Sequence, residues 1–324
     1  MSKFRELGNQ LYSGERSIDF VGRRKLWYAI ALVVVILSVA LPAARGGFNF
    51  GIEFRGGSEF RLTNAQSLPQ NLAVDAIQEV VPGVQVVVTE VGASDLRIQT
   101  EQLEDVESEA ARLNLAEAYG VDSSEVASSF IGPNWGADVT RQALIGLVVF
   151  LLVVSLLMAL YFRSWKMSAA ALLALAHDLI ITIGIYGAVG FEVTPAAVIG
   201  FLTILSYSLY DTVVVFDKVR ENTLEIEFSE TRTFGEMVNL AVNQTLVRSI
   251  NTSIVAVLPV GSILFIGSIV LGAGTLRDIA LALFVGTIVG TYSSVFLAAP
   301  IYVHLREKEP ALKAAAEKVL AARA

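Results

Sequence analysis

Cysteine is absent from this sequence of 324 residues, and histidine occurs only at His177 and His304. Without cysteine the chain forms neither a disulfide framework nor a thiolate metal site. Two histidines far apart in the sequence do not make a metal site of the HExxH kind. These absences exclude thiol redox chemistry and argue against a metalloenzyme. We therefore expect no metal, no cofactor and no catalytic residue.

Charged residues are also scarce. They make up 17% of the chain, whereas a typical soluble domain has about 25%. Apolar residues make up 54%, and the mean hydropathy is +0.61. The formal net charge of -7 does not suit nucleic-acid binding, because phosphate contacts need a basic face. The composition indicates an integral membrane protein and argues against nucleic acid as a partner.

Charge-poor runs of about 20 residues, the length at which an α-helix crosses a bilayer, recur along the chain. They predict six transmembrane helices, over 26–44, 142–162, 167–190, 194–216, 244–271 and 279–303. The first run follows Arg23-Arg24-Lys25 and ends in small residues, a pattern that cleaved signal peptides share. We interpret it as a retained anchor because it is longer than a typical h-region and starts about 25 residues into the chain.

Lysine and arginine occur in the N-terminal segment 1–25, in the links after the second and fourth predicted helices, and in the tail 304–324. The positive-inside rule places these segments in the cytoplasm. Both termini then lie inside, as an even number of crossings requires, and the acidic segment 45–141 lies outside. We predict a membrane α-helical protein with one external domain after the first helix and a five-helix transmembrane block over 142–303.

The external segment has its own pattern of secondary structure. It predicts strands at 58–62, 84–91, 96–100 and 126–131, with helices at 68–80 and 103–119. This β-α-β-β-α-β order is that of a small α+β, ferredoxin-like domain. The glycine-rich segment 51–57 lacks the GxxxxGK[ST] pattern of a phosphate-binding loop, so we interpret it as a tight turn at the exit from the membrane.

Asp211 is a carboxylate within the fourth predicted helix. It precedes Asp217, where we place the cytoplasmic end, by six residues and should lie roughly 9 Å deep. A charge at a helix centre costs about 2.5 to 3.5 kcal/mol, so Asp211 needs a partner or a proton. Snorkelling to the interface is the alternative, although aspartate has little stem for it. Arg248, a few residues inside the start of the fifth predicted helix, should lie at a similar depth and is the candidate partner.

Other polar residues accompany this pair. Those expected to support it are Thr203, Tyr207, Gln244, Asn251 and Thr252. The first two lie within two turns of Asp211, and the other three share a helical face with Arg248. We expect these faces to point at each other rather than at lipid. A static ion pair that only holds two helices together is the alternative to a functional one.

A second polar element lies in the third predicted helix. His177 and Asp178 are adjacent there, with Thr182 one turn further on, and they suit a proton relay. A structural hydrogen bond between helices fits these residues equally well. The sixth predicted helix carries small residues at every fourth position, which predicts close helix packing: Gly286, Gly290 and Ser294.

These motifs resemble those of the SecF membrane subunits of the bacterial preprotein translocase, relatives of the RND transporters. Residues 206–221, SYSLYDTVVVFDKVRE, are similar to the family's fourth-helix signature. Residues 243–246, NQTL, together with Arg248, Thr252 and Ser253, are similar to its fifth-helix signature. The His177-Asp178 pair and the segments 51–57 and 290–294 also fit.

Two departures from the family pattern stand out. Ser206 and Tyr210 occupy positions where the family pattern reads Gly and Asn, so packing around the carboxylate should differ. Glu53 and Arg55 occupy positions where Asp and Thr are commoner, and the resemblance therefore assigns them no role.

The resemblance implies a subunit of the bacterial inner membrane that, with SecD, uses the proton-motive force to promote late steps of protein translocation through SecYEG. It implies SecD, the SecYEG translocon, YajC, secretory proteins in transit and membrane lipid as partners. It also implies proton-coupling roles for Asp211 and Arg248, with Asp178 and His177 as further candidates. The alternative is a proton-driven RND-type exporter of small hydrophobic compounds that acts with a partner chain. An intramembrane hydrolase is disfavoured, because the motifs HExxH, GxGD and GxSxG are missing.

Overall fold

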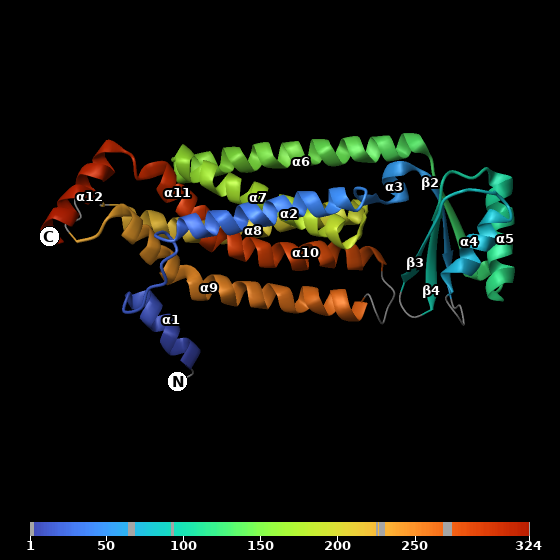
Figure 1. The fold of residues 1–324 in the computed structure, drawn as a ribbon, viewed down its shortest axis with the longest axis horizontal. Helices are drawn as coiled ribbons and strands as arrows, with labels where there is room; N and C mark the ends of the chain where they lie inside the picture. The colour runs from blue at the N-terminus through green and yellow to red at the C-terminus, as the bar shows by residue number, and fades with distance from the viewer. Residues whose placement is uncertain are drawn as a thin grey trace.

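The computed structural model describes residues 3–63, 69–91, 94–224, 226, 231–267 and 274–323. They form an elongated helical bundle with a small sheet domain at one end (Figure 1). Both chain ends lie at the other end of the bundle (Figure 1). This placement agrees with an even number of crossings between the two termini.

Six helices within the described ranges are long and apolar enough to cross a membrane, which confirms the predicted number. They are α2 (Arg24–Ala44), α6 (Pro133–Phe162), α7 (Trp165–Val189), α8 (Pro195–Thr223), α9 (Phe234–Ser262) with its π-helical continuation η3 (Ile263–Gly267), and α10 (Gly274–Ser293), which continues through π-helical η4 (Ser294–Ala298) into α11 (Ala299–Arg306). Two further helices, α1 (Lys3–Ser13) and α12 (Pro310–Arg323), lie at the end of the bundle that carries the termini (Figure 1).

Several helices extend beyond the apolar runs that predicted them. Helix α9 begins at Phe234 rather than at 244, and α8 continues past Asp217 to Thr223. Charged residues are compatible with a helix that continues into water, so a charge-poor window marks the crossing and not the helix ends. Arg248 therefore lies near the middle of α9, not near its start. Residues 268–271 of the predicted fifth helix and residue 68 of the predicted helix 68–80 lie outside the described residues.

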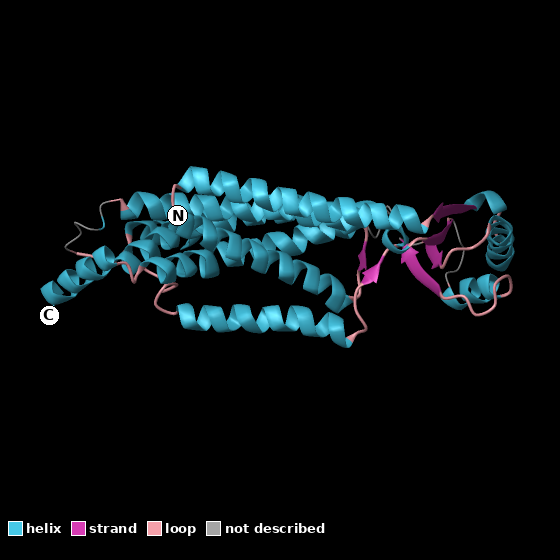
Figure 2. Ribbon diagram, turned by 90° about the horizontal axis from the view of Figure 1, so that it is seen from above, coloured by secondary structure: helices cyan, strands magenta, loops and turns pink. Residues whose placement is uncertain are grey.

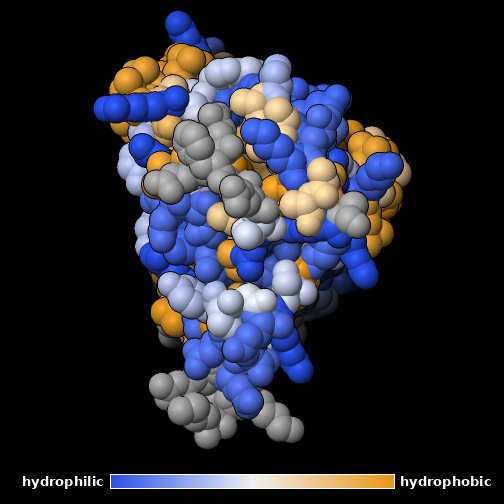
Figure 3. Space-filling model, turned by 90° about the vertical axis from the view of Figure 1, so that its left-hand side faces the viewer, coloured by the Kyte–Doolittle hydropathy of each residue, from blue (hydrophilic) through white to orange (hydrophobic). Residues whose placement is uncertain are grey.

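The outside of the bundle is largely apolar, and its interior holds buried polar residues such as Asp178 and Asp211. In the apolar window of α6 only 11% of residues are buried, and Leu152 and Leu160 there are each 65% exposed. In α7, which lies inside the bundle, the buried share is 56%. The end of the bundle that carries the termini is largely hydrophilic, with hydrophobic side chains at its flanks (Figure 3). This distribution suits a bundle surrounded by lipid with one end in water.

The sheet domain has the predicted order of elements. Its strands and helices are β2 (Gly57–Leu62), α4 (Gln70–Gln78), β3 (Val86–Val91), β4 (Asp95–Thr100), α5 (Asp105–Tyr119), the 3-10 turn η1 (Ser123–Glu125) and β5 (Val126–Ile131). The sheet order is β3-β4-β2-β5 with antiparallel neighbours, which confirms the ferredoxin-like fold. Helices α4 and α5 cover the face that is turned away from the bundle, and Phe60, Ile98 and Leu115 fill the core between them (Figure 1).

A short junction joins this domain to the bundle. After α2, strand β1 (Asn49–Phe50) pairs in parallel with β6 (Glu192–Val193), which lies between α7 and α8 (Figure 2). The one-turn helix α3 (Ile52–Arg55) follows, and the chain then turns through Gly56 and Gly57 with φ of 81° and 142°. A Cβ on Gly57 would lie 2.3 Å from the carbonyl oxygen of Thr100, so only glycine fits there. The predicted turn is thus confined to Gly56 and Gly57, and residues 52–55 of the glycine-rich segment form a helix instead.

Candidate functional site

Asp211 lies in the interior of the bundle, on the face of α8 that meets α9 and η4. Asp211 is only 6% exposed. The hydroxyl of Ser249 in α9 donates to Oδ1 at 2.7 Å, and the hydroxyl of Ser294 in η4 donates to Oδ2. Two neutral donors from two other segments therefore hold this carboxylate.

Asp178 occupies an equivalent environment on α7 and is 2% exposed. The hydroxyls of Ser293 and Ser208 both donate to its Oδ2, the first at 2.7 Å. Its Oδ1 lies 3.2 Å from Nδ1 of His177, the preceding residue. The Nε2 atom of His177 is buried and has no hydrogen-bond partner among the residues that the structure describes.

The two carboxylates belong to one polar cluster. Ser293 and Ser294 are consecutive, at the point where α10 becomes the π-helix η4. Ser208 lies one turn before Asp211 on α8, and π-helical turns are frequent at functional sites. Because a hydroxyl can both donate and accept, serine neighbours suit an ionised and a protonated carboxylate alike. The cluster can hold either a charge or a proton in an apolar surrounding.

The predicted ion pair between Asp211 and Arg248 is not found among the described contacts. Arg248 is exposed on the outside of α9, and its Nη2 donates to the hydroxyl of Tyr210 at 3.4 Å. Adjacent residues on an α-helix point about 100° apart, so a helix that turns Ser249 toward Asp211 turns Arg248 away from it. The matched depth was a sound expectation, since Ser249 touches Asp211, but the rotation of α9 was wrong.

The predicted supporting residues make other contacts than those expected with Asp211 and Arg248. Thr203 donates to the carbonyl of Ile199 in its own helix, and Thr252 donates to that of Arg248. Asn251 is exposed, and the amide of Gln244 bonds the side chain of Asn222 and the backbone of Tyr12 instead of α8 near Asp211. The hydroxyl of Tyr207 is buried without a hydrogen-bond partner in the described part of the chain. The predicted α9 face thus points outward.

The face of α9 that does meet the interior carries small hydroxyl residues. Thr245, Ser249 and Ser253 succeed one another at intervals of four, and Ser249 is completely buried. The hydroxyl of Ser253 contacts that of Thr291 on α10. Serine and threonine are common at buried helix contacts in membranes, where they bond across helices.

Glycines bring α10 close enough to α8 for these bonds to form. A Cβ on Gly286 would lie 2.2 Å from Ile204, and one on Gly290 would lie 2.8 Å from the Cβ of Ser208. The predicted close packing of the small-residue repeat is confirmed. Ser294, the last member of that repeat, has the additional role of donating to Asp211.

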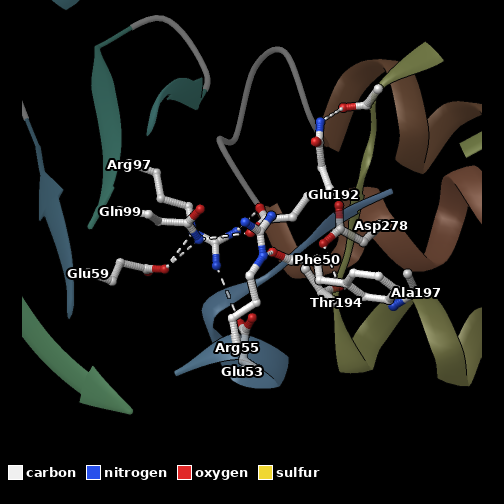
Figure 4. A network of polar contacts seen from close by, with 12 residues as sticks. Phe50, Glu53, Arg55, Glu59, Arg97, Gln99, Glu192, Thr194, Ala197 and Asp278 are labelled. Carbon is white, nitrogen blue, oxygen red and sulfur yellow. Dashed lines mark hydrogen bonds and ion pairs between the residues drawn. The ribbon is translucent and has the colours of Figure 1, made fainter. Parts of the chain in front are cut away.

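A second polar cluster lies at the junction, in a cleft of about 740 Å³ between the sheet domain and the bundle. Arg97 of β4 stands at its centre and contacts three carboxylates (Figure 4). Its guanidinium lies 2.7 Å from Glu59, 2.9 Å from Glu192 and 3.3 Å from Glu53. Gln99, two residues further along β4, donates to Glu192 at 2.8 Å and to Glu59 at 3.2 Å.

Burial and charge act on this junction cluster in opposite directions. Burial raises the pKa of the Glu53 carboxyl, although the positive charge of Arg97 partly counteracts it. One oxygen of Glu53, Oε2, is buried without a hydrogen-bond partner among the described atoms. Burial alone would lower the pKa of Arg97. The negative charges of Glu192, Glu59 and Glu53 have the larger effect, so the pKa of Arg97 is raised. The junction thus combines one firmly charged guanidinium with an excess of carboxylates.

Sequence reasoning found both buried aspartates but missed their serine partners and the junction cluster. Ser294 was interpreted only as a small residue of the packing repeat, and Ser208 only as part of the fourth-helix signature. The carboxylates that pair with Arg97 come from positions 53, 59 and 192, and no local sequence pattern links these positions. Within the described residues, no group of three or more His, Asp or Glu side chains is placed to hold a metal ion.

Known proteins match this chain over nearly its whole length. Residues 112–308 match the family model described as protein export membrane protein SecD/SecF, C-terminal. The protein translocase subunit SecF of Streptomyces coelicolor is 44% identical, over 100% of this chain and 86% of that protein. SecF of Rhodothermus marinus is 35% identical over 90% of this chain and 94% of that protein.

Solved structures support the same relationship. The crystal structure of SecDF, a translocon-associated membrane protein from Thermus thermophilus, aligns with a TM-score of 0.77 and 32% identity. The alignment covers 90% of this chain and 39% of the SecDF chain. A structure titled SecDF in super-membrane-facing form aligns with a TM-score of 0.65. The present chain therefore spans about two fifths of the solved SecDF chains.

Proposed function

This chain belongs to the SecD/SecF family of protein-export membrane proteins, and we propose that it acts with SecD to couple the proton-motive force to late steps of protein translocation through SecYEG. The observation that carries the proposal is Asp211. It is a carboxylate in the interior of a multi-pass membrane protein, held by hydroxyls from two other segments. Ionisable residues in such positions mark proton pathways in membrane proteins.

Proton binding at Asp211 changes the bonds that hold three segments together. A hydrogen bond to a charged group contributes about 1.5 to 3 kcal/mol, and one between neutral groups about 0.5 to 1.5 kcal/mol. Protonation weakens the bonds from Ser249 and Ser294 accordingly, by about 1 kcal/mol each. A proton that crosses 100 mV releases about 2.3 kcal/mol, which is of the same size. Such a change is sufficient to shift the balance between two arrangements of the bundle.

The exposed face of α9 is where we place SecD. Arg248 and Asn251 point outward from a helix whose apolar window is only 11% buried, and Tyr210 beside them is 53% exposed. Lipid offers no hydrogen bonds to an arginine, and exposure to it costs about 2.5 to 3.5 kcal/mol at mid-membrane. A partner helix with an acidic residue at this depth would remove that cost. SecD is the expected source, since the name SecDF joins the two subunits in one chain.

SecYEG, YajC and secretory proteins in transit are the further partners, and membrane lipid covers the rest of the apolar surface. The chain resides in the bacterial inner membrane with both termini in the cytoplasm, so the sheet domain faces the acidic side of the proton gradient. Asp178 and His177 act with Asp211 in proton coupling.

Substitution of Asp211 by Asn tests the proposal. In inverted membrane vesicles that contain SecD and SecYEG, we expect Asp211→Asn to abolish the stimulation of secretion by a proton gradient while expression, folding and SecD binding persist. Asp217→Asn is the matched control, because Asp217 lies on the same helix but contacts only the Tyr161 hydroxyl among the described residues. Full stimulation with Asp211→Asn would refute Asp211 as the proton carrier. Export of small hydrophobic compounds, the alternative from the sequence, gains no support from relatives that are named as translocase subunits.

A further inference from the structure

Glu192 lies in the turn between α7 and α8, and its side chain bonds the sheet domain directly. Its Oε2 accepts from Arg97 at 2.9 Å and its Oε1 from Gln99 at 2.8 Å (Figure 4). Arg97 and Gln99 are two residues apart on β4, so both side chains project from one face of the sheet. That face is the one turned toward the bundle.

The position of Glu192 links this contact to α8. Two residues beyond Glu192, Thr194 caps the N-terminus of α8 and its hydroxyl also donates to Asp278 of α10 at 2.8 Å. Helix α8 is continuous from Pro195 to beyond Asp211. At 1.5 Å per residue these two positions lie about 24 Å apart along one helix. A displacement of α8 at Asp211 therefore displaces the turn that carries Glu192.

Glu59 receives the same two donors but lies within the sheet domain. Arg97 donates to it at 2.7 Å and Gln99 at 3.2 Å. When Glu192 is removed, both donors retain Glu59 as a partner, so neither becomes an unsatisfied buried group. The sheet domain can therefore lose its side-chain contacts with the turn before α8 without losing its fold.

We propose that Arg97 and Gln99 are positioning residues that transmit movement of α8 to the sheet domain through Glu192. The proposal rests on the proposed function, because it takes Asp211 as the site where movement of α8 begins. Proton binding changes the bonds at Asp211, α8 shifts, and the contact at Glu192 carries the shift to β4. The orientation of the sheet domain then follows the protonation state of a residue about 24 Å away along α8.

Distance measurements between two spin labels test this transmission. The chain contains no cysteine, so Val106→Cys on α5 and Leu152→Cys in the middle of α6, away from the turn that carries Glu192, give unique labelling sites, which are 80% and 65% exposed. The full chain is labelled in lipid nanodiscs, and Asp211→Asn mimics the protonated state. We expect Asp211→Asn to shift the mean label distance when Glu192 is present. Glu192→Ala should remove this shift, and Glu192→Gln, which keeps an acceptor oxygen, should retain part of it.

Glu59→Ala is the matched control, since it removes contacts to the same two donors but none to the bundle. We expect the shift to persist in Glu59→Ala, with thermal unfolding showing that every variant is folded. A shift that persists in Glu192→Ala would overturn the proposal, and so would its equal loss in Glu59→Ala or its absence in the parent chain. If Asp211→Asn supports full secretion while the label distances behave as expected, the proposed function fails and the transmission contact stands.

Discussion

Asp178 and Asp211, on neighbouring helices, accept hydrogen bonds from consecutive residues of one segment: Ser293 donates to the first and Ser294 to the second. A movement of this segment at one carboxylate therefore also changes the hydrogen bond at the other. The two donors lie at the start of a π-helical turn, where the backbone departs from regular α-helical hydrogen bonding. Asp178 is therefore placed to respond to changes at Asp211 without direct contact between the two carboxylates.

Loss of a serine donor at Asp211 should weaken both stability and coupling. Ser249→Ala and Ser294→Ala each remove one of the two hydroxyls that hold a buried carboxylate, at an expected cost of about 1 to 3 kcal/mol. We expect lower thermal midpoints and reduced proton-dependent secretion for both. Ser155→Ala is the control, because that hydroxyl bonds the backbone of its own helix. Equal behaviour of all three variants would show that the serines do not support Asp211.

Close packing between α8 and α10 should be sensitive to a single methyl group. Gly290→Ala places a Cβ about 2.8 Å from that of Ser208, which itself bonds Asp178. We expect overpacking to destabilise the bundle by about 1 to 3 kcal/mol, measured by thermal unfolding in detergent. Gly146→Ala on α6 should be tolerated, since nothing lies within 4 Å of the added atom. An unchanged midpoint for Gly290→Ala would contradict this packing.

Arg248 should matter for coupling and not for the stability of the isolated chain. Its described side-chain hydrogen bond, to Tyr210 at 3.4 Å, is long, and the side chain is exposed. We expect Arg248→Met to change the free energy of unfolding of the chain by no more than about 0.5 kcal/mol, measured by thermal unfolding, while proton-dependent secretion with SecD falls. Thr203→Val, on the outside of α8, serves as a control. Unchanged transport would reduce Arg248 to a packing role.

Asn243, part of the fifth-helix signature, should act in folding at the end of the bundle that carries the termini. It is 1% exposed, and its side-chain amide accepts from the backbone NH of Ile18 at 2.8 Å and donates to its carbonyl at 2.9 Å. Asn243→Ala should free this segment, destabilise the chain by about 1 to 3 kcal/mol and expose Arg16 to trypsin. Asn251→Ala, at an exposed position of the same helix, should not. Unaltered proteolysis of Asn243→Ala would contradict this role of Asn243 in holding the N-terminal segment.

The junction should become less stable as the pH rises. Burial raises the pKa of Glu53 above 4.5, so the folded state binds a proton more tightly than the unfolded chain. Stability from this group is complete below pH 4.5 and is lost as the pH rises through the folded pKa. Glu53→Gln should flatten this part of the pH profile of thermal unfolding.

Glu109 provides a comparison of opposite sign. The hydrogen bond from Arg112 lowers the pKa of Glu109, so its contribution is present above pH 4.5 and is lost as the pH falls. Glu109→Gln should therefore act on the acid side of the profile. If Glu53→Gln and Glu109→Gln change the profile in the same direction, the assignment for Glu53 is wrong.

Sequence patterns by themselves determined the six crossings, the order of elements in the sheet domain, and the two buried aspartates. Each of these follows from local chemistry. A run of apolar residues needs lipid wherever it lies, alternation of residues marks a strand, and a carboxylate in such a run is costly in any fold. The packing role of Gly286 and Gly290 was readable for the same reason, because small residues at one helical spacing allow close approach.

Only the tertiary structure decided which side chains meet. The predicted partner of Asp211 was Arg248 and the observed partner is Ser249, a difference that corresponds to a rotation of α9 by one residue, or about 100°. Hydropathy does not resolve such a rotation in a helix that is mostly exposed. The three carboxylates that contact Arg97 come from the one-turn helix α3, the neighbouring strand β2 and the turn between α7 and α8. Such contacts depend on how distant segments are placed by the packing of the whole chain, and no local pattern encodes them.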